Sequence, residues 1–272
     1  MCKTKSCVIS VIIPTYNRGY VLKEVINSYF SDKVNEIVIV DDGSNDNTYE
    51  VVLKSILSFK NIKYVRHKKR KGLPAARNTG IKNVSDKSDY IFFGEDDVFL
   101  IEKCYDIMLE VLNQNQVELV AANVKYLSEG DDYRIYLKKD INLIYPKSLN
   151  DIFKFKSIHM ALKCVYNDFN FDEGYILNSY REETDFYIRV NQKYSMVLIE
   201  NYLAFNLPRS VCNKGGEWSF NPFIYEVSTI CNNMRFLVKN KKYTKMNFLK
   251  ILIEQIKFSF ERLRILKTKI WK

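Results

Sequence analysis

The segment EIVIVDDGS, residues 36–44, joins an apolar run rich in β-branched residues to an acidic turn. The segment YIFFGEDD (90–97) is built in a similar way. The segment VISVIIP (8–14) is an apolar run that ends at Pro14, and NIKYV (61–65) is a weaker apolar run. Near-continuous apolar runs of this length are typical of strands buried in a parallel sheet. The sequence therefore predicts parallel strands, two of which end in clustered carboxylates.

Apolar residues with helical spacing fill the intervals between these strands. Residues 21–29 and 51–59 each carry one apolar face, with Ser44 or Asp46 as a suitable cap for the second helix. Pro74 suits the first turn of a third helix. This alternation predicts an α/β fold with a doubly wound, mostly parallel sheet and right-handed crossovers. Such sheets bind ligands at the carboxyl ends of their strands, where the carboxylates are expected.

The second half of the chain is less regular. Residues 127–180 mix Tyr, Asp and Lys and give no clear pattern. Around them we expect a helix over 101–115, a strand over 117–126, a helix over 181–193, a strand over 197–199 and a long helix over 244–271.

Length and composition restrict the class of protein. The 272 residues, 47% of them hydrophobic, suffice for one large domain or two modest ones that share a core. The six cysteines include no C-x-x-C pair, so zinc and redox motifs lack support. No signal-peptide pattern occurs, and no apolar run approaches the roughly 20 residues of a spanning helix. We therefore expect reduced thiols in a cytoplasmic protein.

The net charge of +10 is concentrated toward the end of the chain. Residues 241–272 contain ten basic and two acidic residues, a local charge of +8. Charge gathered in one segment, rather than spread over a basic face, argues against a nucleic-acid partner. No P-loop, nucleophile-elbow or dinucleotide-binding glycine motif occurs either, which leaves those chemistries without support.

The acidic run Glu95-Asp96-Asp97 is a candidate metal site. Three adjacent carboxylates repel one another unless a cation or water separates them. Hard divalent cations take oxygen ligands, and Mg²⁺ is often shared between carboxylates and phosphates. A solvated acidic turn is the alternative reading, and the position after a buried strand favours the metal site.

Two further segments carry candidate chemistry. Asp41 and Asp42, which end the second strand, suit contacts to ribose hydroxyls or simply an ordinary turn. Arg77 stands in an otherwise small and apolar helix start, a position that favours anions. The segment REETD, residues 181–185, places three carboxylates in a first helical turn. They suit either compensation of the helix dipole or a general base, and on these residues alone the former is favoured.

Together these segments resemble the family 2 glycosyltransferases, which have the Rossmann-like GT-A fold. The resemblance covers roughly residues 8–190 in five ordered segments, VIIPTYNR (11–18), VIVDDGS (38–44), GLPAARNTG (72–80), FFGEDD (92–97) and REETDF (181–186). Each segment alone is modestly specific, whereas their order and spacing together are specific.

The resemblance implies an inverting transfer of a hexosyl or N-acetylhexosaminyl group from a nucleoside-diphosphate sugar, a UDP-sugar being favoured. The acceptor would be a hydroxyl of a glycan or lipid-linked molecule in surface polysaccharide or glycoconjugate synthesis. Glu183 would be the general base, with Glu182 and Asp185 as rivals. The metal would be Mn²⁺ or Mg²⁺, held by Asp97 with Glu95. The donor would be bound by Pro14, Thr15, Asn17, Arg18, Asp41, Asp42, Arg77 and Asp96.

Two departures from the family pattern concern the metal. The first acidic position of the D-x-D motif is Glu95, one methylene longer than Asp. Many relatives have a His before a Gly-Gly pair, and here Asn206 is the candidate replacement before Gly215-Gly216. We therefore expect the diphosphate and water to complete the metal shell and the metal affinity to be low.

The expected organisation is a GT-A catalytic domain over residues 1–218 and a basic amphipathic helical extension over 219–272. Within the first, residues 1–100 would bind the donor and 101–218 the acceptor. The extension suits contact of residues 244–271 with an anionic membrane surface, here the inner face of the cell membrane. Packing on the catalytic domain and homodimer formation are the alternatives. The competing functions are a sugar nucleotidyltransferase, whose Gly-rich N-terminal loop is absent, and a non-catalytic basic peripheral membrane protein.

Overall fold

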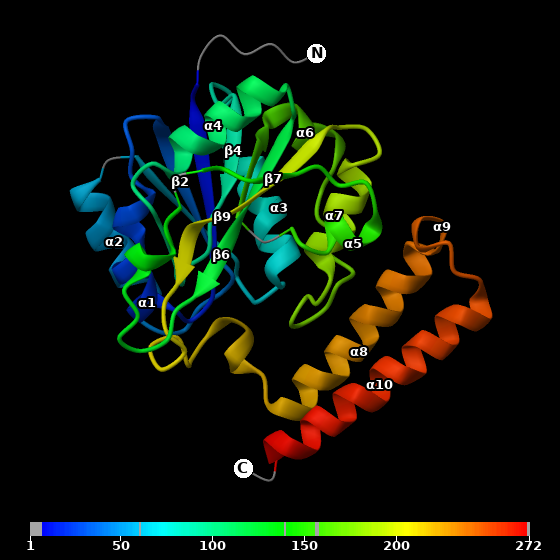
Figure 1. The fold of residues 1–272 in the computed structure, drawn as a ribbon. Coiled ribbons are helices and arrows are strands. Elements are labelled where there is room, and N and C mark those ends of the chain that lie inside the picture. The colour runs from blue at the N-terminus through cyan, green and yellow to red at the C-terminus, as the bar shows by residue number, and fades with distance from the viewer. Residues whose placement is uncertain (1–6, 60, 139, 156–157, 271–272) are drawn as a thin grey trace.

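The computed structural model describes residues 7–59, 61–138, 140–155 and 158–270. Figure 1 shows an α/β body from which a long helical hairpin projects. The strands in the described part of the chain form one sheet. They are β1 (Ile9–Thr15), β2 (Val34–Asp41), β3 (Ile62–Arg66), β4 (Tyr90–Phe93), β5 (Val98–Leu100), β6 (Leu119–Tyr126), β7 (Leu143–Ile144), β8 (His159–Leu162) and β9 (Met196–Asn206).

The sheet has two parts with different pairing. Its order is β3-β2-β1-β4-β8-β6-β9-β5, with β7 paired to β9. The strands β3, β2, β1 and β4 are parallel to one another, as predicted. Beyond them β8 runs antiparallel between β4 and β6, β9 is parallel to β6, and β5 and β7 are antiparallel to β9. The register sets Thr15 beside Asp41, so the polar ends of β1 and β2 lie at one edge.

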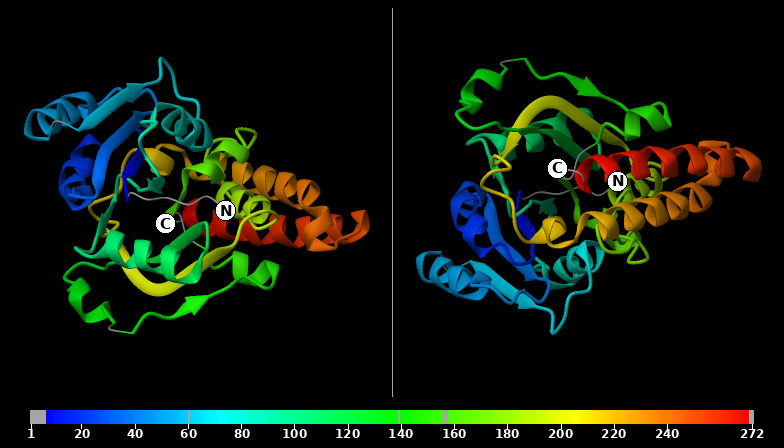
Figure 2. Two further views of the ribbon diagram at one scale, coloured as in Figure 1. Left: turned by 90° about the horizontal axis from the view of Figure 1, so that it is seen from above. Right: turned by 90° about the horizontal axis from the view of Figure 1, so that it is seen from below.

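Helices cover both faces of this sheet, as the views from above and below show (Figure 2). Those of the body are α1 (Gly19–Val25), η1 (Ile26–Tyr29), α2 (Thr48–Ser58), α3 (Leu73–Asn83), α4 (Cys104–Asn115), η2 (Tyr133–Tyr136), α5 (Leu149–Ile152), α6 (Lys163–Asp168), α7 (Glu182–Val190) and η3 (Gly216–Ser219). The C-terminal ones are α8 (Pro222–Lys239), α9 (Lys241–Thr244) and α10 (Phe248–Ile270).

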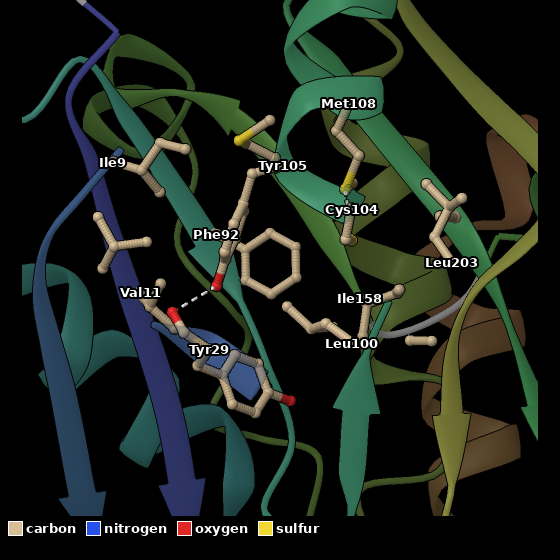
Figure 3. Packing of buried hydrophobic residues seen from close by; sticks show 14 of the residues in the cluster. Ile9, Val11, Tyr29, Phe92, Leu100, Cys104, Tyr105, Met108, Ile158 and Leu203 are labelled. Atoms are coloured by element: carbon tan, nitrogen blue, oxygen red, sulfur yellow. Dashed lines mark hydrogen bonds between the residues drawn. The ribbon is translucent and has the colours of Figure 1, made fainter. Parts of the chain in front are cut away.

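A buried aromatic group connects the core to the acidic turn (Figure 3). The Phe92 ring lies edge-on to Tyr29 and Tyr105, with centroids at 6.3 and 5.1 Å, and the Tyr105 hydroxyl donates to the Tyr29 carbonyl at 3.1 Å. The Tyr29 hydroxyl accepts from the Glu95 amide at 3.0 Å. A Cβ on Gly94 would lie 2.4 Å from the Tyr29 ring, so glycine lets the turn approach this closely. Core packing therefore positions the turn that carries the carboxylates.

Several predicted boundaries differ from the structure. The strand β5 lies where the sequence suggests only a turn and the approach to a helix, which begins at Cys104 rather than residue 101. The strand β9 extends to Asn206, well beyond the predicted residues 197–199. The N-cap of α2 is Asn47 rather than Ser44 or Asp46. Residues 127–180, which gave no pattern, contribute β7, β8 and three short helices.

The C-terminal hairpin consists of α8 and α10, joined through α9 at its tip (Figure 1). The helix α8 was not predicted as a separate element. The expected boundary after residue 218 falls inside η3, and the division into two domains stays a prediction. Among the described residues, none of the helices combines the length and the apolar character needed to cross a bilayer.

Candidate functional site

A cavity of about 560 Å³ opens at the carboxyl edge of the parallel strands. Thr15 from the end of β1, Asp42 after β2 and Asp97 after β4 line it. Glu183 from α7 and Asn206 from the end of β9 line it too. The cavity thus brings together residues from all five sequence segments that carry the family resemblance.

Arg18 is the internal counter-ion of the acidic turn. Its Nη1 lies 2.9 Å from Oδ1 of Asp96 and 2.7 Å from Oδ2 of Asp97, and all three side chains are largely buried. Burial raises the pKa of Asp96, as does the charge of Asp97, and Arg18 opposes both. Burial tends to lower the pKa of Arg18, but the two carboxylates outweigh it and hold that pKa above its usual value. The pair of acids is therefore kept together by one guanidinium.

The predicted metal ligands Asp97 and Asn206 are adjacent. The side-chain amide of Asn206 donates to Oδ1 of Asp97 at 3.3 Å, and the Leu207 amide donates to the Asp97 carbonyl at 2.9 Å. Glu95 lines the same cavity. Within the described residues, no group of three or more His, Cys, Asp or Glu side chains is arranged to hold an ion. These side chains offer hard oxygen ligands for a divalent cation, but another ligand must complete its coordination shell.

Arg77 joins α3 to the acidic start of α7. Its guanidinium pairs with both Glu182 and Glu183, and its centre lies 5.1 Å above the Phe171 ring. The Arg77 side chain is almost wholly buried, although it lines the cavity. The structure thus engages the group predicted to hold the nucleoside in an ion-pair network that orients Glu183.

The three carboxylates of α7 have different surroundings. The side chain of Asp185 is fully buried and accepts from Nε of Arg189 at 2.9 Å, Nζ of Lys239 at 2.8 Å and Nδ2 of Asn240 at 3.0 Å. It does not line the cavity, and it attaches the hairpin to the body. Glu182 is buried against Arg77, whereas the side chain of Glu183 is 27% exposed. Only Glu183 therefore combines exposure with access to the cavity.

Two predicted donor-binding residues lie outside the cavity lining. Asp41 is buried beneath it, where it accepts from the Ser44 amide at 2.7 Å and from the Tyr64 hydroxyl. Asn17 accepts from the Asn45 amide at 2.7 Å through its side-chain oxygen. Both shape the loops around the cavity, because they hold backbone rather than facing the open space.

The other predicted donor-binding residues line the cavity: Pro14, Thr15, Arg18, Asp42, Arg77 and Asp96. The Asp42 carboxylate accepts from the amides of Lys71 and Gly72, both at 2.8 Å. It also lies 2.7 Å from Nδ1 of His67. Asp42 therefore joins the basic loop to the end of β2.

The sequence did not predict a cluster of contacts centred on Arg70, which joins the loop after β1 to the loop over residues 207–220. Its guanidinium lies 4.0 Å above the Tyr16 ring and 4.3 Å from the Phe220 ring, and it donates to the Gly216 carbonyl at 2.9 Å. Burial lowers the pKa of Arg70. The run at residues 68–71 marks a basic loop, but nothing in it singles out Arg70 or its partner some 150 residues later.

Further contacts with the end of β1 fix the loop over residues 207–220. The Gly216 amide donates to the Tyr16 carbonyl at 2.7 Å, and Arg18 donates to the Lys214 carbonyl at 3.3 Å. Gly215 has a φ of +70°, and a Cβ there would lie 2.1 Å from the Asn17 carbonyl oxygen. Glycine is required for this approach, which closes the loop onto the end of β1.

Comparisons with known proteins agree with this arrangement. The family model described as Glycosyl transferase family 2 matches residues 10–165. The poly(ribitol-phosphate) beta-N-acetylglucosaminyltransferase TarP of Staphylococcus aureus is 30% identical over 73% of this chain. The minor teichoic acid biosynthesis protein GgaA of Bacillus subtilis is 31% identical over 56% of it. The crystal structure of S. aureus TarS 1-349 in complex with UDP-GlcNAc superimposes with a TM-score of 0.62 at 17% identity, over 85% of this chain and 66% of that one.

These matches differ in how much of each relative they cover. The aligned segments span 66% of TarP and 35% of GgaA. The likeness to TarS establishes the GT-A fold, and the family match extends over more than half of the chain. The chain therefore belongs to the family 2 glycosyltransferases.

Proposed function

We propose that the protein is an inverting glycosyltransferase that moves a sugar, an N-acetylhexosamine or hexose, from a UDP-sugar to an acceptor hydroxyl. The observation that carries this proposal is the cavity that Asp96, Asp97 and Glu183 line together. The name of TarP specifies transfer of N-acetylglucosamine to a poly(ribitol-phosphate), and TarS was crystallised with UDP-GlcNAc. Those names support a UDP-sugar donor and an acceptor in surface polysaccharide synthesis, on a glycan or a lipid carrier.

The donor would lie along the side of the cavity formed by the ends of β1, β2 and β4. Arg18 and the backbone around Thr15 suit the diphosphate, and Tyr16, held flat against Arg70, suits the base. Asp97, Asn206 and Glu95 would hold Mn²⁺ or Mg²⁺ together with the diphosphate. The metal, when bound, supplies charge stabilisation to the leaving group.

Glu183 would take the proton of the acceptor hydroxyl. The oxygen then forms a bond to the anomeric carbon as the bond from that carbon to the diphosphate oxygen breaks, which inverts the configuration. Arg77 orients Glu183 throughout, because its guanidinium is fixed by burial and by Glu182. We place the reaction in the cytoplasm, at the inner face of the cell membrane.

The test compares two carboxylates of the same helix. With UDP-GlcNAc as donor and poly(ribitol phosphate) as acceptor, Glu183→Gln is expected to lower kcat by about 10²–10⁴ with UDP binding unchanged. Asp185→Asn serves as the matched control, because its carboxylate holds the hairpin and lies outside the cavity. It should reduce stability while the folded enzyme retains its kcat. Loss of turnover in Asp185→Asn with Glu183→Gln active would reject Glu183 as the base.

A further inference from the structure

In the helix α8 the usual distribution of buried apolar and exposed polar side chains is largely reversed. Most of the side chains that it turns toward α10 and the catalytic body are polar, with Phe236 and Leu237 as buried apolar exceptions, and most of those that it turns to solvent are apolar. Its buried polar residues are Glu226, Ser228, Thr229, Asn232 and Asn233. Its exposed large apolar residues are Phe223, Ile224, Val227 and Val238. In a helix that packs only on its own domain the distribution is the reverse.

The helix α10 also exposes an apolar face. Ile251, Gln255 and Leu266 are buried. On the opposite side of α10 an apolar stripe repeats every three or four residues, and all of it is exposed. Its members are Leu249, Leu252, Ile253, Ile256, Phe260 and Leu263. The sequence predicts an amphipathic helix over this segment, and the six residues of its apolar stripe are between 39% and 70% exposed.

Contacts between the elements show where these two exposed faces lie. Asn233 donates to Gln255 at 2.9 Å, which joins α8 to α10. Asn232 donates to the Ile176 carbonyl at 2.8 Å, and Phe258 stacks on Tyr180 at 5.7 Å, which join the two helices to the body. The exposed apolar residues point away from both sets of contacts. By helical periodicity they therefore form one apolar outer face on the side of the hairpin turned away from the body.

Positive charge borders this outer face. Lys250, Lys257 and Arg264 are exposed and spaced seven residues apart, so they follow one edge of α10. Glu254 pairs with Lys257 at 3.1 Å, and Glu261 is exposed one turn before Arg264, so basic residues outnumber acidic ones along this edge. Lys241, Lys242 and Lys245 are exposed at the tip. Two copies that met through this face would bring these like charges together. An anionic lipid surface would satisfy both the charges and the apolar side chains.

We propose that the outer face of the α8–α10 hairpin binds an anionic membrane surface, with both helices lying in its plane. This matches the absence of a spanning helix in the described residues. The polar seam between the helices, which includes the Glu226–Arg262 ion pair at 2.5 Å, and the buried Leu237 and Ile251 hold the hairpin together without the exposed apolar residues. The proposal does not depend on the transferase reaction, although it would bring the cavity close to membrane-bound acceptors.

The experiment is flotation of the full chain with vesicles of phosphatidylcholine alone or mixed with phosphatidylglycerol. We expect binding to the anionic vesicles at low salt and weakening as salt rises. The triple variant Lys250→Glu, Lys257→Glu, Arg264→Glu should lower the partition coefficient by on the order of a hundredfold. The double variant Ile256→Asp, Phe260→Asp should lower it by at least roughly tenfold.

Leu57→Asp is the matched control, because Leu57 is 86% exposed on α2, away from the hairpin. It should bind vesicles like the unaltered chain, and circular dichroism should show all variants folded. Equal binding to neutral and anionic vesicles would overturn the proposal, as would vesicle binding that survives both sets of hairpin substitutions. So would a dimer in sedimentation velocity that dissociates on Ile256→Asp, Phe260→Asp while the unaltered chain binds no vesicles.

Discussion

The catalytic body buries its apolar residues in its core, whereas the C-terminal hairpin exposes many of its apolar residues. In the body, β1 and β4 are wholly buried, β2 is buried from Ile37 to Asp41, and charge gathers around one cavity. In the hairpin, Asn233, Gln255 and Glu226 are buried between helices, and Phe223 and Phe260 face outward. The body is therefore stabilised chiefly by burial of apolar area, whereas the hairpin combines a few buried apolar side chains, Phe236, Leu237, Ile251 and Leu266, with specific polar pairs.

The difference indicates separate roles for the two regions. A polar seam gives little net stability but specifies one pairing of helices, since every buried donor and acceptor must find its partner. Such a hairpin keeps a defined shape while its apolar side remains available for another surface.

Two phenylalanines provide the largest contrast. Phe92→Ala in β4 should lower the free energy of unfolding by about 3–5 kcal/mol, because it opens a cavity beside Tyr29 and Tyr105. Phe260→Ala, at a side chain 70% exposed on α10, should change it by less than about 0.5 kcal/mol. Urea denaturation measures the free energy of unfolding of both variants. Equal losses would contradict the contrast between a buried body and an exposed hairpin face.

The polar seam provides the next effect. Asn233→Ala should cost about 1–3 kcal/mol, because it leaves the buried side chain of Gln255 without that donor. Replacing both Asn233 and Gln255 by Leu should recover most of this loss, since no unsatisfied partner remains of that pair. A double variant as unstable as the sum of its single variants would show that the seam depends on something other than this pairing.

The smallest effect concerns how the hairpin is attached. Burial tends to raise the pKa of Asp172, but Lys239 and Arg235 of α8 outweigh it and lower that pKa to about 2. This contribution to stability is complete above the ordinary carboxyl pKa of roughly 4 and is lost as the pH falls toward about 2. The stability gap between the unaltered chain and Asp172→Asn should therefore close over that range. A gap that stays constant from neutral pH to about 2 would contradict the assignment.

Sequence reasoning succeeded where local pattern and burial coincide. The strands β1, β2 and β4 could be predicted because their apolar runs are buried on both faces. The strand β5, three residues directly after the acidic turn, has too little sequence to show a period. For the hairpin, periodicity identifies an apolar face but does not say whether that face is buried, and for α10 it is mostly exposed.

The sequence predicts which residues line the cavity better than it predicts which of them contact one another. The motifs indicate Asp97 and Glu183, and the structure sets both on one cavity. The ion pair between Arg18 and Asp97 joins residues 79 apart, and that between Arg77 and Glu183 joins residues 106 apart. No spacing in the sequence reports such pairs, because they depend on how the elements pack. For the same reason the sequence does not separate Asp185 from Glu183, whereas the structure places Asp185 outside the cavity lining.

The most direct test of the account is calorimetric titration of UDP into the protein with and without Mn²⁺. We expect UDP to bind and Mn²⁺ to strengthen that binding, while Mn²⁺ alone binds weakly because the diphosphate completes its shell. Asp97→Ala should abolish the effect of the metal, whereas Asp106→Ala, which removes an exposed carboxylate on α4, should preserve it. If UDP and UDP-sugars failed to bind the folded protein at any metal concentration, the assignment of the cavity as a donor site would be wrong.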